Sequence, residues 1–570
     1  MSDTSGRAGE RGQLSAAGIF IGCVGCVILT SSSVYTALKM GSLPWPTIFT
    51  SITALVLLRA LGHRSLNEAN VTQIIMSAGS MVAGGLAFTI PGIWMLGLTG
   101  EVSFAETLGV ALAGTLLGLV CTALIRRRFV VESTLEYPVG TAAAETLRAS
   151  RAGSGTGKKL FGSMAFAGIY CVLRDVLHFL PARLATLAIP GVNFAINNSP
   201  MMLATGFLVG TGAVTAWFVG ALLGNFGVIV GGTTVGLWDV TTAKGIVSSL
   251  GMGLMMGSGI GVVIKDVLPQ LVGILRGAGR RAATGSATGS NGSDGAAGEK
   301  RGWAADITSR LDAGVLGLMV AAAALVICFG LGLGPVVAVV MVLFSFVTTI
   351  MSAQSVGQTG IDPMEIFGLI VLLAVAAFSD TAEVKLFFVA GVIAVACGLA
   401  GDVMSDFKTG HLIGTNPRTM WMGQAIGSLL GAVVATVVLS ALVAAYGPDA
   451  FGTDKLFVAA QANVVATMVS GIPSMPAFAL GLAAGVVLYL VGLPAMMLGL
   501  GVYLPFYMSF TAFLGSVAHR VYDRVTRARG VDAQKATEDG LVVASGLLGG
   551  ESIVGVIIAL VSVAGGLMAM

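Results

Sequence analysis

The side chains that could bind a solute or carry a proton are concentrated between two apolar segments in the second half of the chain. The stretch runs from Gly401 to Gly431, and the apolar segments are 384–400 and 429–445. Its polar members are Asp402, Asp406, Lys408, His411, Asn416, Arg418 and Gln424. Pro417 interrupts any continuous helix here. Two interpretations are open: a solvated loop, which charged runs usually form, or a polar segment that enters the membrane and lines a cavity.

Carboxylic acids among apolar segments are candidates for carrying a coupling proton. A carboxyl group in a poorly hydrated cavity can bind and release a proton near neutral pH. Five side chains are predicted to have this role: Glu68, Glu145, Asp402, Asp406 and Glu551. Glu68 has an alternative role, because it follows Asn67 at the start of a predicted helix and could act as a cap.

Amides and cations are the candidates for holding a substrate. Gln354 and Gln358 are four residues apart, so they share a helical face and could hydrogen-bond a peptide backbone or a chelate carboxylate. Lys408 or Arg418 suits an anionic group, which Arg can grip in a bidentate way. The alternative for the glutamines is interhelical hydrogen bonding. The predicted substrate-binding residues are Tyr137, Gln354, Gln358, Lys408, Asn416, Arg418 and Gln424.

Motifs for enzymes, cofactors and nucleic acids are weak or missing. Cys23-x-x-Cys26 has a metal-like spacing, but it lies in a Gly-rich apolar segment without a second such pair. The 153–159 stretch lacks the first glycine and the final Ser or Thr of a phosphate-binding loop. Basic clusters flank apolar segments without interleaved aromatics. The sequence therefore predicts no enzyme, no metal site, no cofactor and no nucleic-acid partner.

The elements that must position these residues are apolar helices. Hydrophobic residues make up 55% of the chain and charged residues 10%, against the ~25% charged of soluble proteins. The predicted fold is an all-α polytopic membrane protein, with about 14 to 17 crossings and some re-entrant or broken segments. The expected spans are 14–38, 44–62, 68–90, 104–125, 160–180, 200–213, 214–236, 246–272, 311–330, 333–353, 365–379, 384–400, 420–445, 456–470, 477–491, 494–515 and 541–569.

The chain divides near its middle. Residues 276–305 are rich in Gly, Ser, Ala and charge and predict a flexible linker between residues 14–275 and 306–570. The polar tail 1–13 precedes an uncleaved first span. Because basic loops remain inside, we expect the tail and the linker to be cytoplasmic and the protein to lie in the cell membrane.

The two halves look like copies of each other. Ile75-Met76-Ser77-Ala78 recurs as Ile350-Met351-Ser352-Ala353, a shift of 350 − 75 = 275, and the same shift carries Ser199 to Ser474. The stretch 401–431 then falls on 126–156, which also contains a Pro-interrupted polar segment. Paired interruptions in two repeats point to a binding site in secondary transporters. The repeats' relative orientation stays open.

Several motifs together resemble one family. They are Asp406-Phe-Lys-Thr-Gly410 with Gly414-Thr-Asn-Pro-Arg418 and Gly423-Gln424, Asn67-Glu68-Ala69-Asn70, Tyr137-Pro138-Val139-Gly140-Thr141, Ser199-Pro200, and Ala544-Ser545-Gly546 through Glu551. They resemble the oligopeptide transporter (OPT) superfamily, as a prokaryotic-type member related to the yellow-stripe-like branch.

The resemblance implies proton-coupled symport of small peptides or peptide-like substrates. The NPG and KIPPR motifs of the eukaryotic peptide-transporting branch are missing from the sequence, so a metal-chelate transporter is the alternative. A passive channel is the alternative of another class. The expected partners are the substrate, protons and the lipid bilayer, and a homo-oligomer is left open.

Overall fold

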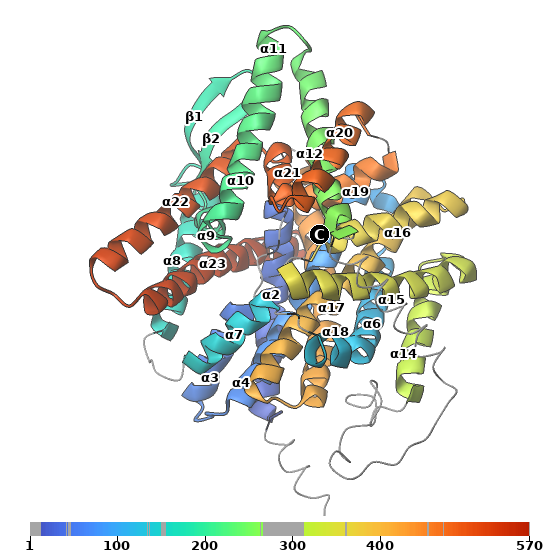
Figure 1. Cartoon of the computed structure of the whole chain (residues 1–570), viewed down its shortest axis with the longest axis vertical. Helices are drawn as coiled ribbons and strands as arrows, with labels where there is room; N and C mark the ends of the chain where they lie inside the picture. The colour runs from blue at the N-terminus through green and yellow to red at the C-terminus, as the bar shows by residue number, and fades with distance from the viewer. Residues whose placement is uncertain are drawn as a thin grey trace, which may run out of the picture.

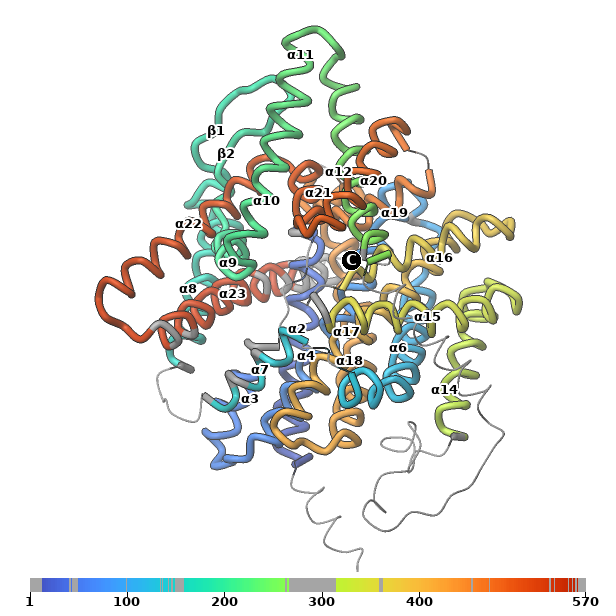
Figure 2. Tube along the Cα trace, viewed as in Figure 1, coloured from blue at the N-terminus to red at the C-terminus, as the bar shows by residue number. Residues whose placement is uncertain are grey.

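Apolar helices account for nearly all of the described chain, as the composition predicts. Figure 1 shows the computed structural model, and Figure 2 follows its trace. The structure describes residues 13–41, 43, 47–133, 135, 137–149, 156–262, 264–265, 313–359, 362–452, 455–470 and 472–568. The predicted linker 276–305 and nearly all of the predicted tail 1–13 lie outside these residues. The side chains of Glu145 and Gln358 also lie outside the description.

Five long helices form a buried bundle. They are α2 (Ala16–Met40), α4 (Leu66–Ala87), α6 (Phe104–Arg126), α17 (Glu383–Ile413) and α18 (Pro417–Tyr446). The most apolar windows of α4 and α17 are completely buried, whereas those of α2 and α18 are half-buried. The helices α4 and α17 therefore lie at the centre, and their polar side chains are enclosed by protein.

A second group joins helices from both halves of the chain. Its members are α9 (Pro200–Leu208), α10 (Thr211–Leu222), η4 (Leu223–Gly231), α11 (Gly232–Thr234), α12 (Val240–Val262), α20 (Met475–Leu490), α21 (Ala495–Tyr503) and α22 (Phe506–Ala528). Helix α12 packs on α20 and α21, and α10 packs on α21 and α22. Figure 1 shows α10 and α12 as two arms of a tall hairpin with α11 at its tip.

Shorter and peripheral elements complete the fold. They are α3 (Thr47–Ala60), α5 (Pro91–Met95), η1 (Thr99–Glu101), η2 (Arg127–Val131), α7 (Pro138–Ala149), α8 (Thr156–Asp175), α14 (Ala313–Leu325), η6 (Val326–Gly330), α15 (Gly334–Thr359), α16 (Met364–Phe378), η7 (Pro448–Ala450), α19 (Ala460–Ser470) and α23 (Ala533–Met568). Helix α23 packs against α8, α9, α2 and α18.

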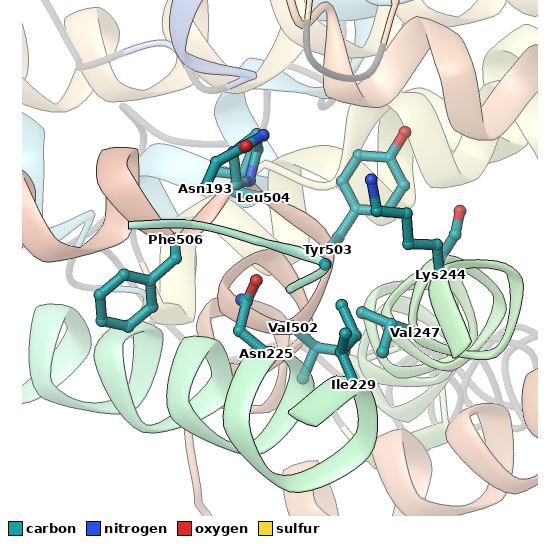
Figure 3. Close-up of a pocket in the computed structure, with 12 residues that line it drawn as sticks. Asn193, Asn225, Ile229, Lys244, Val247, Val502, Tyr503, Leu504 and Phe506 are labelled. Atoms are coloured by element: carbon teal, nitrogen blue, oxygen red, sulfur yellow. The ribbon is translucent and has the colours of Figure 1, made fainter. Parts of the chain in front are cut away.

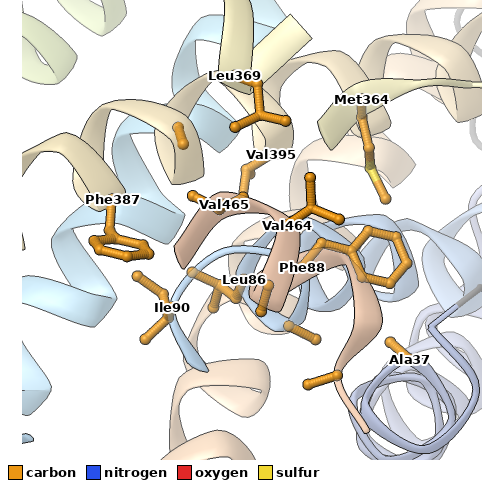
Figure 4. Packing of buried hydrophobic residues seen from close by; sticks show 14 of the residues in the cluster. Ala37, Leu86, Phe88, Ile90, Met364, Leu369, Phe387, Val395, Val464 and Val465 are labelled. Atoms are coloured by element: carbon orange, nitrogen blue, oxygen red, sulfur yellow. The ribbon is translucent and has the colours of Figure 1, made fainter. Parts of the chain in front are cut away.

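The largest hydrophobic core extends over many helices, and part of it lies around α4, α16, α17 and α19. Figure 4 shows Leu86 and Phe88 beside Val464 and Val465, with Val395 close by. These positions are buried, and they come from segments far apart in the sequence. Packing of this kind holds helices together in lipid, where the hydrophobic effect between helices is weak.

Small residues allow a very close crossing of α4 and α18. A Cβ atom added to Gly431 of α18 would lie 2.2 Å from the Cα atom of Gly79 in α4. No side chain fits at that separation, so glycine at both positions lets the two backbones touch. The crossing places α18 directly against the central helix α4.

Fewer helices are long enough to cross a membrane than the sequence predicts. Among the described residues, seven helices have the length and apolar composition of a membrane span. Several predicted spans are divided: 494–515 becomes α21 and α22, because Pro505 lies between them. Predicted spans such as 365–379 correspond to shorter apolar helices, here α16. The fold class is confirmed: an all-α polytopic membrane protein with almost no sheet.

One element was not predicted. Residues 183–197, which follow α8 directly, form an antiparallel hairpin of β1 (Arg183–Ile189) and β2 (Val192–Asn197). Its turn contains Pro190 and Gly191, and Gly191 has a φ of 77°, a conformation that glycine adopts easily. The Pro-Gly dipeptide between two apolar runs was the signal that could have identified it.

The stretch 401–431 is a helix, a tight turn and a second helix. Helix α17 continues to Ile413, Gly414 closes it with a φ of 82°, and Pro417 is the first residue of α18. Pro417 thus begins a helix instead of breaking one, which its ring permits. The solvated-loop interpretation is wrong for Asp402 and Asp406, because both are buried on α17.

Candidate functional site

The carboxyl group of Asp406 lies in a network of neutral hydrogen-bond donors. Gln73 of α4 donates its Nε2 to Asp406 Oδ1 at 2.9 Å, and Gln424 of α18 donates to Oδ2 at 2.6 Å. Thr50 of α3 donates to the Oε1 atom of Gln73 at 2.9 Å. All four side chains are buried. The network links four helices through one carboxyl group without a cation among these contacts.

Asp402 lies one helical turn before Asp406 and has no such support. Its side chain is 0% exposed, and neither carboxyl oxygen has a hydrogen-bond partner. The two carboxyl groups are four residues apart on one helix, close enough for their charges to interact. A buried carboxyl group without a hydrogen-bond partner is rare in a protein interior, so Asp402 is an unusual feature of α17.

Two further acids near this region were not predicted as site residues. Asp362, in the segment before α16, accepts a hydrogen bond from Ser352 at 2.9 Å, and its other oxygen has no partner. Glu365 on α16 is 3% exposed. The signal available in the sequence was the Asp362-Pro363 interruption, which follows the repeated segment Ile350–Ala353 within ten residues. No described group of three or more His, Cys, Asp or Glu side chains is arranged to hold a metal ion.

Glu551 of α23 lies in a different electrostatic environment. It accepts hydrogen bonds from Arg174 at 2.9 Å, from Ser199 Oγ at 2.9 Å and from the main-chain N–H of Met201 at 2.9 Å. Arg174 also pairs with Asp175 at 2.6 Å. Arg174, Ser199 and Met201 come from α8 and the start of α9, where free N–H groups favour a negative charge. These contacts hold the Glu551 carboxyl group between a cation and the start of α9.

Glu68 occupies the first turn of α4. The helix is capped by Ser65, whose hydroxyl accepts a hydrogen bond from the Glu68 main-chain N–H at 3.3 Å. The Glu68 carboxyl group accepts a hydrogen bond from Ser15 and pairs with His63 at 2.8 Å. Glu68 thus ties the start of α2 to the start of α4.

Comparison with known families identifies the chain. Residues 13–562 match the family described as OPT oligopeptide transporter protein. The chain belongs to the OPT family.

The relatives of this OPT protein come from bacteria and plants. A Haemophilus influenzae protein named "Putative oligopeptide transporter" is 26% identical over 92% of each chain. "Metal-nicotianamine transporter YSL2" of Oryza sativa subsp. japonica is 31% identical over 24% of this chain and 20% of its own length. The protein of that name in Arabidopsis thaliana is 39% identical over 15% of this chain and 13% of its own. The family assignment made from the motifs is confirmed.

In this OPT protein the predicted substrate-binding residues fall into separate places. Gln424 belongs to the Asp406 network. Tyr137 donates to the carbonyl oxygen of Ala353 at 3.1 Å. Gln354, the next residue after Ala353, is buried, and its Nε2 atom has no hydrogen-bond partner. Lys408 donates to the carbonyl oxygen of Leu135 at 2.8 Å.

The other two predicted residues lie at the turn before α18. Asn416 caps that helix by accepting hydrogen bonds from the main-chain N–H groups of Arg418 and Thr419. Arg418 is half-buried. The structure therefore brings Asp406 and Gln424 together, with Asp402 one turn away on α17, and it holds Asn416 and Arg418 at the start of α18.

Proposed function

We propose that this OPT protein is a secondary active transporter that couples proton movement to the movement of a small amino-acid-derived substrate. Asp406 and Asp402 are the proposed proton carriers. The observation that carries the proposal is the buried Asp406 carboxyl group, which is held by two neutral amides and no cation. Either protonation state can exist there at moderate cost, and this is the requirement for a group that loads and releases a proton.

The neighbouring amide offers a way for protonation to alter the helix contacts. When Asp406 is ionised, both of its oxygens accept hydrogen bonds. When it is protonated, its O–H needs an acceptor, and the unpartnered Oε1 atom of Gln424 can accept once the amide rotates. Protonation would thereby change the contact between α17 and α18. Asp402, one turn away, would stay neutral whenever the site is closed to water.

The other predicted proton carriers, Glu68, Glu145 and Glu551, remain candidates, with Glu551 the weakest. Its carboxyl group pairs with Arg174 and accepts from the main-chain N–H of Met201, so it lacks the neutral surroundings of Asp406. Glu68 pairs with His63, so its charge is linked to that histidine. We therefore assign the coupling proton to the α17 carboxyl groups first.

The proposed substrate is a small peptide or a metal chelate of an amino-acid derivative. Tyr137, Gln354, Gln358, Lys408, Asn416, Arg418 and Gln424 remain the proposed contacts. The names of the relatives support both substrate classes, oligopeptides for the bacterial protein and metal–nicotianamine for the plant proteins. A substrate of either class carries carboxylate groups and amide or amine donors.

We also propose that the protein lies in the cell membrane with the amino terminus and the 276–305 linker in the cytoplasm. The basic residues of these segments support this orientation. Cysteine placed at Ser286 should resist an impermeant thiol reagent added to intact cells. Labelling from outside would reverse the proposed orientation.

Uptake by purified protein in liposomes tests the proposed function. The substrates are tripeptides and iron–nicotianamine, each measured with and without an imposed proton gradient. Coupled transport predicts accumulation above the external concentration only when the lumen is alkaline. Equilibration without accumulation would indicate a passive channel, and no flux of any tested substrate would contradict the transport proposal.

A further inference from the structure

A small pocket with a few polar side chains in a mostly apolar lining lies where the two halves of the chain meet, away from the Asp406 network. Figure 3 shows Asn193, Asn225 and Lys244 around one space. They come from β2, η4 and α12 in the first half, and the facing wall is Val502–Phe506 in the second half. Secondary transporters typically bind substrate between their repeated halves.

Two irregularities of the chain shape this pocket. Helix α21 ends at Tyr503 and α22 begins at Phe506, so the backbone between them is not helical. A helix end leaves main-chain polar groups without intrahelical partners, which are then available to a ligand. On the other side, η4 is a π-helical segment, and such segments are frequent at functional sites.

The hairpin turn is fitted closely to the pocket wall. Gly191, between β1 and β2, lines the pocket, and a Cβ atom there would lie 2.7 Å from Ile229 Cγ2 in η4. The turn can approach η4 this closely only because residue 191 has no side chain. The approach places Asn193 of β2 in the lining together with Asn225, whose own amide donates to the carbonyl oxygen of Ala221 at 3.0 Å.

The charge of the lining selects an anion. The twelve described residues that line the pocket include one basic side chain, Lys244, and no acidic one. Asn193, Asn225 and Ser248 add neutral donors and acceptors, and Val247 and Phe506 add apolar surface. The cavity volume of about 80 Å³ has room for a few groups the size of a water molecule. It therefore suits the end of a substrate and not a whole peptide.

We propose that this pocket binds the carboxylate end of the transported substrate, with Lys244 facing the carboxylate and Asn193 and Asn225 facing the adjoining amide or amine. The inference rests on the proposed function for the identity of the ligand. It adds a recognition site distinct from every residue predicted from the sequence. A cation among neutral amides on a partly apolar wall matches the chemistry of a peptide carboxyl terminus or an amino-acid chelate.

Binding to the purified full-length protein tests this site without transport. The probes are trialanine, its carboxyl-terminal amide and iron–nicotianamine, each titrated calorimetrically into wild type and Lys244→Gln. At least one carboxylate probe should bind wild type, and Lys244→Gln should weaken that binding about tenfold, the effect of losing one charge-assisted hydrogen bond. The amide should bind both proteins equally weakly.

Matched variants separate charge from folding. Lys244→Arg keeps the cation and should retain most of the affinity. Lys455→Gln removes an exposed lysine that does not line the pocket and should leave binding unchanged. Unfolding temperatures of all variants should agree with that of wild type.

Two results would overturn the site. One is that the affinity for neither carboxylate probe depends on Lys244. This would be seen if wild type and Lys244→Gln bind the probes equally well, or if neither probe binds wild type. The other is that inorganic phosphate competes as well as the substrate, which would indicate a general anion site. Lys244-dependent binding without gradient-driven uptake would contradict only the transport proposal. Gradient-driven uptake with Lys244-independent binding would overturn only the pocket.

Discussion

Replacing Asp406 by asparagine should uncouple transport and leave the fold intact. Asparagine has nearly the same size, and its Oδ1 can still accept from Gln73. Its new Nδ2 would face the Nε2 of Gln424, two donors that repel each other. Rotation of the Gln424 amide removes the conflict, because its Oε1 has no partner and can accept. Two charge-assisted bonds of about 1.5–3 kcal/mol each become neutral ones of about 0.5–1.5 kcal/mol, so the expected loss of stability is about 2 kcal/mol.

The loss of coupling should be complete, whereas the protein should remain folded. A difference of one pH unit supplies about 1.4 kcal/mol per proton, which supports about tenfold accumulation of substrate for each coupled proton. Asp406→Asn should reduce the accumulation ratio to one. Counterflow exchange of labelled substrate should continue, because the variant can still move substrate without the proton.

The assay is uptake into liposomes of equal protein content, at matched orientation, with an alkaline lumen. Asp449→Asn, which changes an exposed aspartate in η7, is the matched control and should accumulate substrate like wild type. Wild-type accumulation and pH dependence in Asp406→Asn would refute the role of Asp406. Loss of counterflow together with accumulation would indicate a structural role instead.

Three further perturbations probe the packing, the turn and the linker. Gly431→Ala should destabilise the protein by about 1–3 kcal/mol through overpacking against Gly79, and its unfolding temperature should fall. In the control Gly212→Ala the added methyl group has open space, so the unfolding temperature should not fall. Equal unfolding temperatures for the two variants would refute the close crossing. Arg418→Lys keeps the charge but loses the planar fork, so the apparent affinity for substrate should fall about tenfold at unchanged maximal rate; wild-type affinity would remove Arg418 from the site. Replacing residues 277–301 with Gly-Ser of equal length should preserve folding and uptake, and a protein that no longer folds would refute the linker.

The fold class and the central helices were predictable because their signals are local. Long apolar segments and low charge content are sufficient to predict membrane helices. The sequence shows that residues 401–413 contain unusually many polar side chains for an apolar region, but it does not determine their backbone conformation. Pro417 is compatible with a loop, a kink or the first turn of a helix, and only the packing of α17 against α4 and α18 decides among these.

The partners of the buried charges could not be predicted. Glu551 meets Arg174 across 377 residues of sequence, and Asp406 meets Gln73 across 333. Such pairs depend on how helices cross, which periodicity does not encode. The sequence consequently predicted the same proton-carrying role for both residues, although Glu551 lies beside a cation and Asp406 lies among amides. The pocket shown in Figure 3 could not be predicted for the same reason, because its polar residues come from a strand, a π-helical segment and a helix.

Proton movement caused by substrate tests the central claim most directly. Wild-type protein is placed in liposomes that contain a pH-sensitive dye, with equal pH on both sides and no imposed gradient. Substrate added outside should acidify the lumen as it enters, at a fixed ratio of protons to substrate, and Asp406→Asn should take up substrate without this acidification. Substrate entry through the wild-type protein with no change in luminal pH would contradict proton coupling.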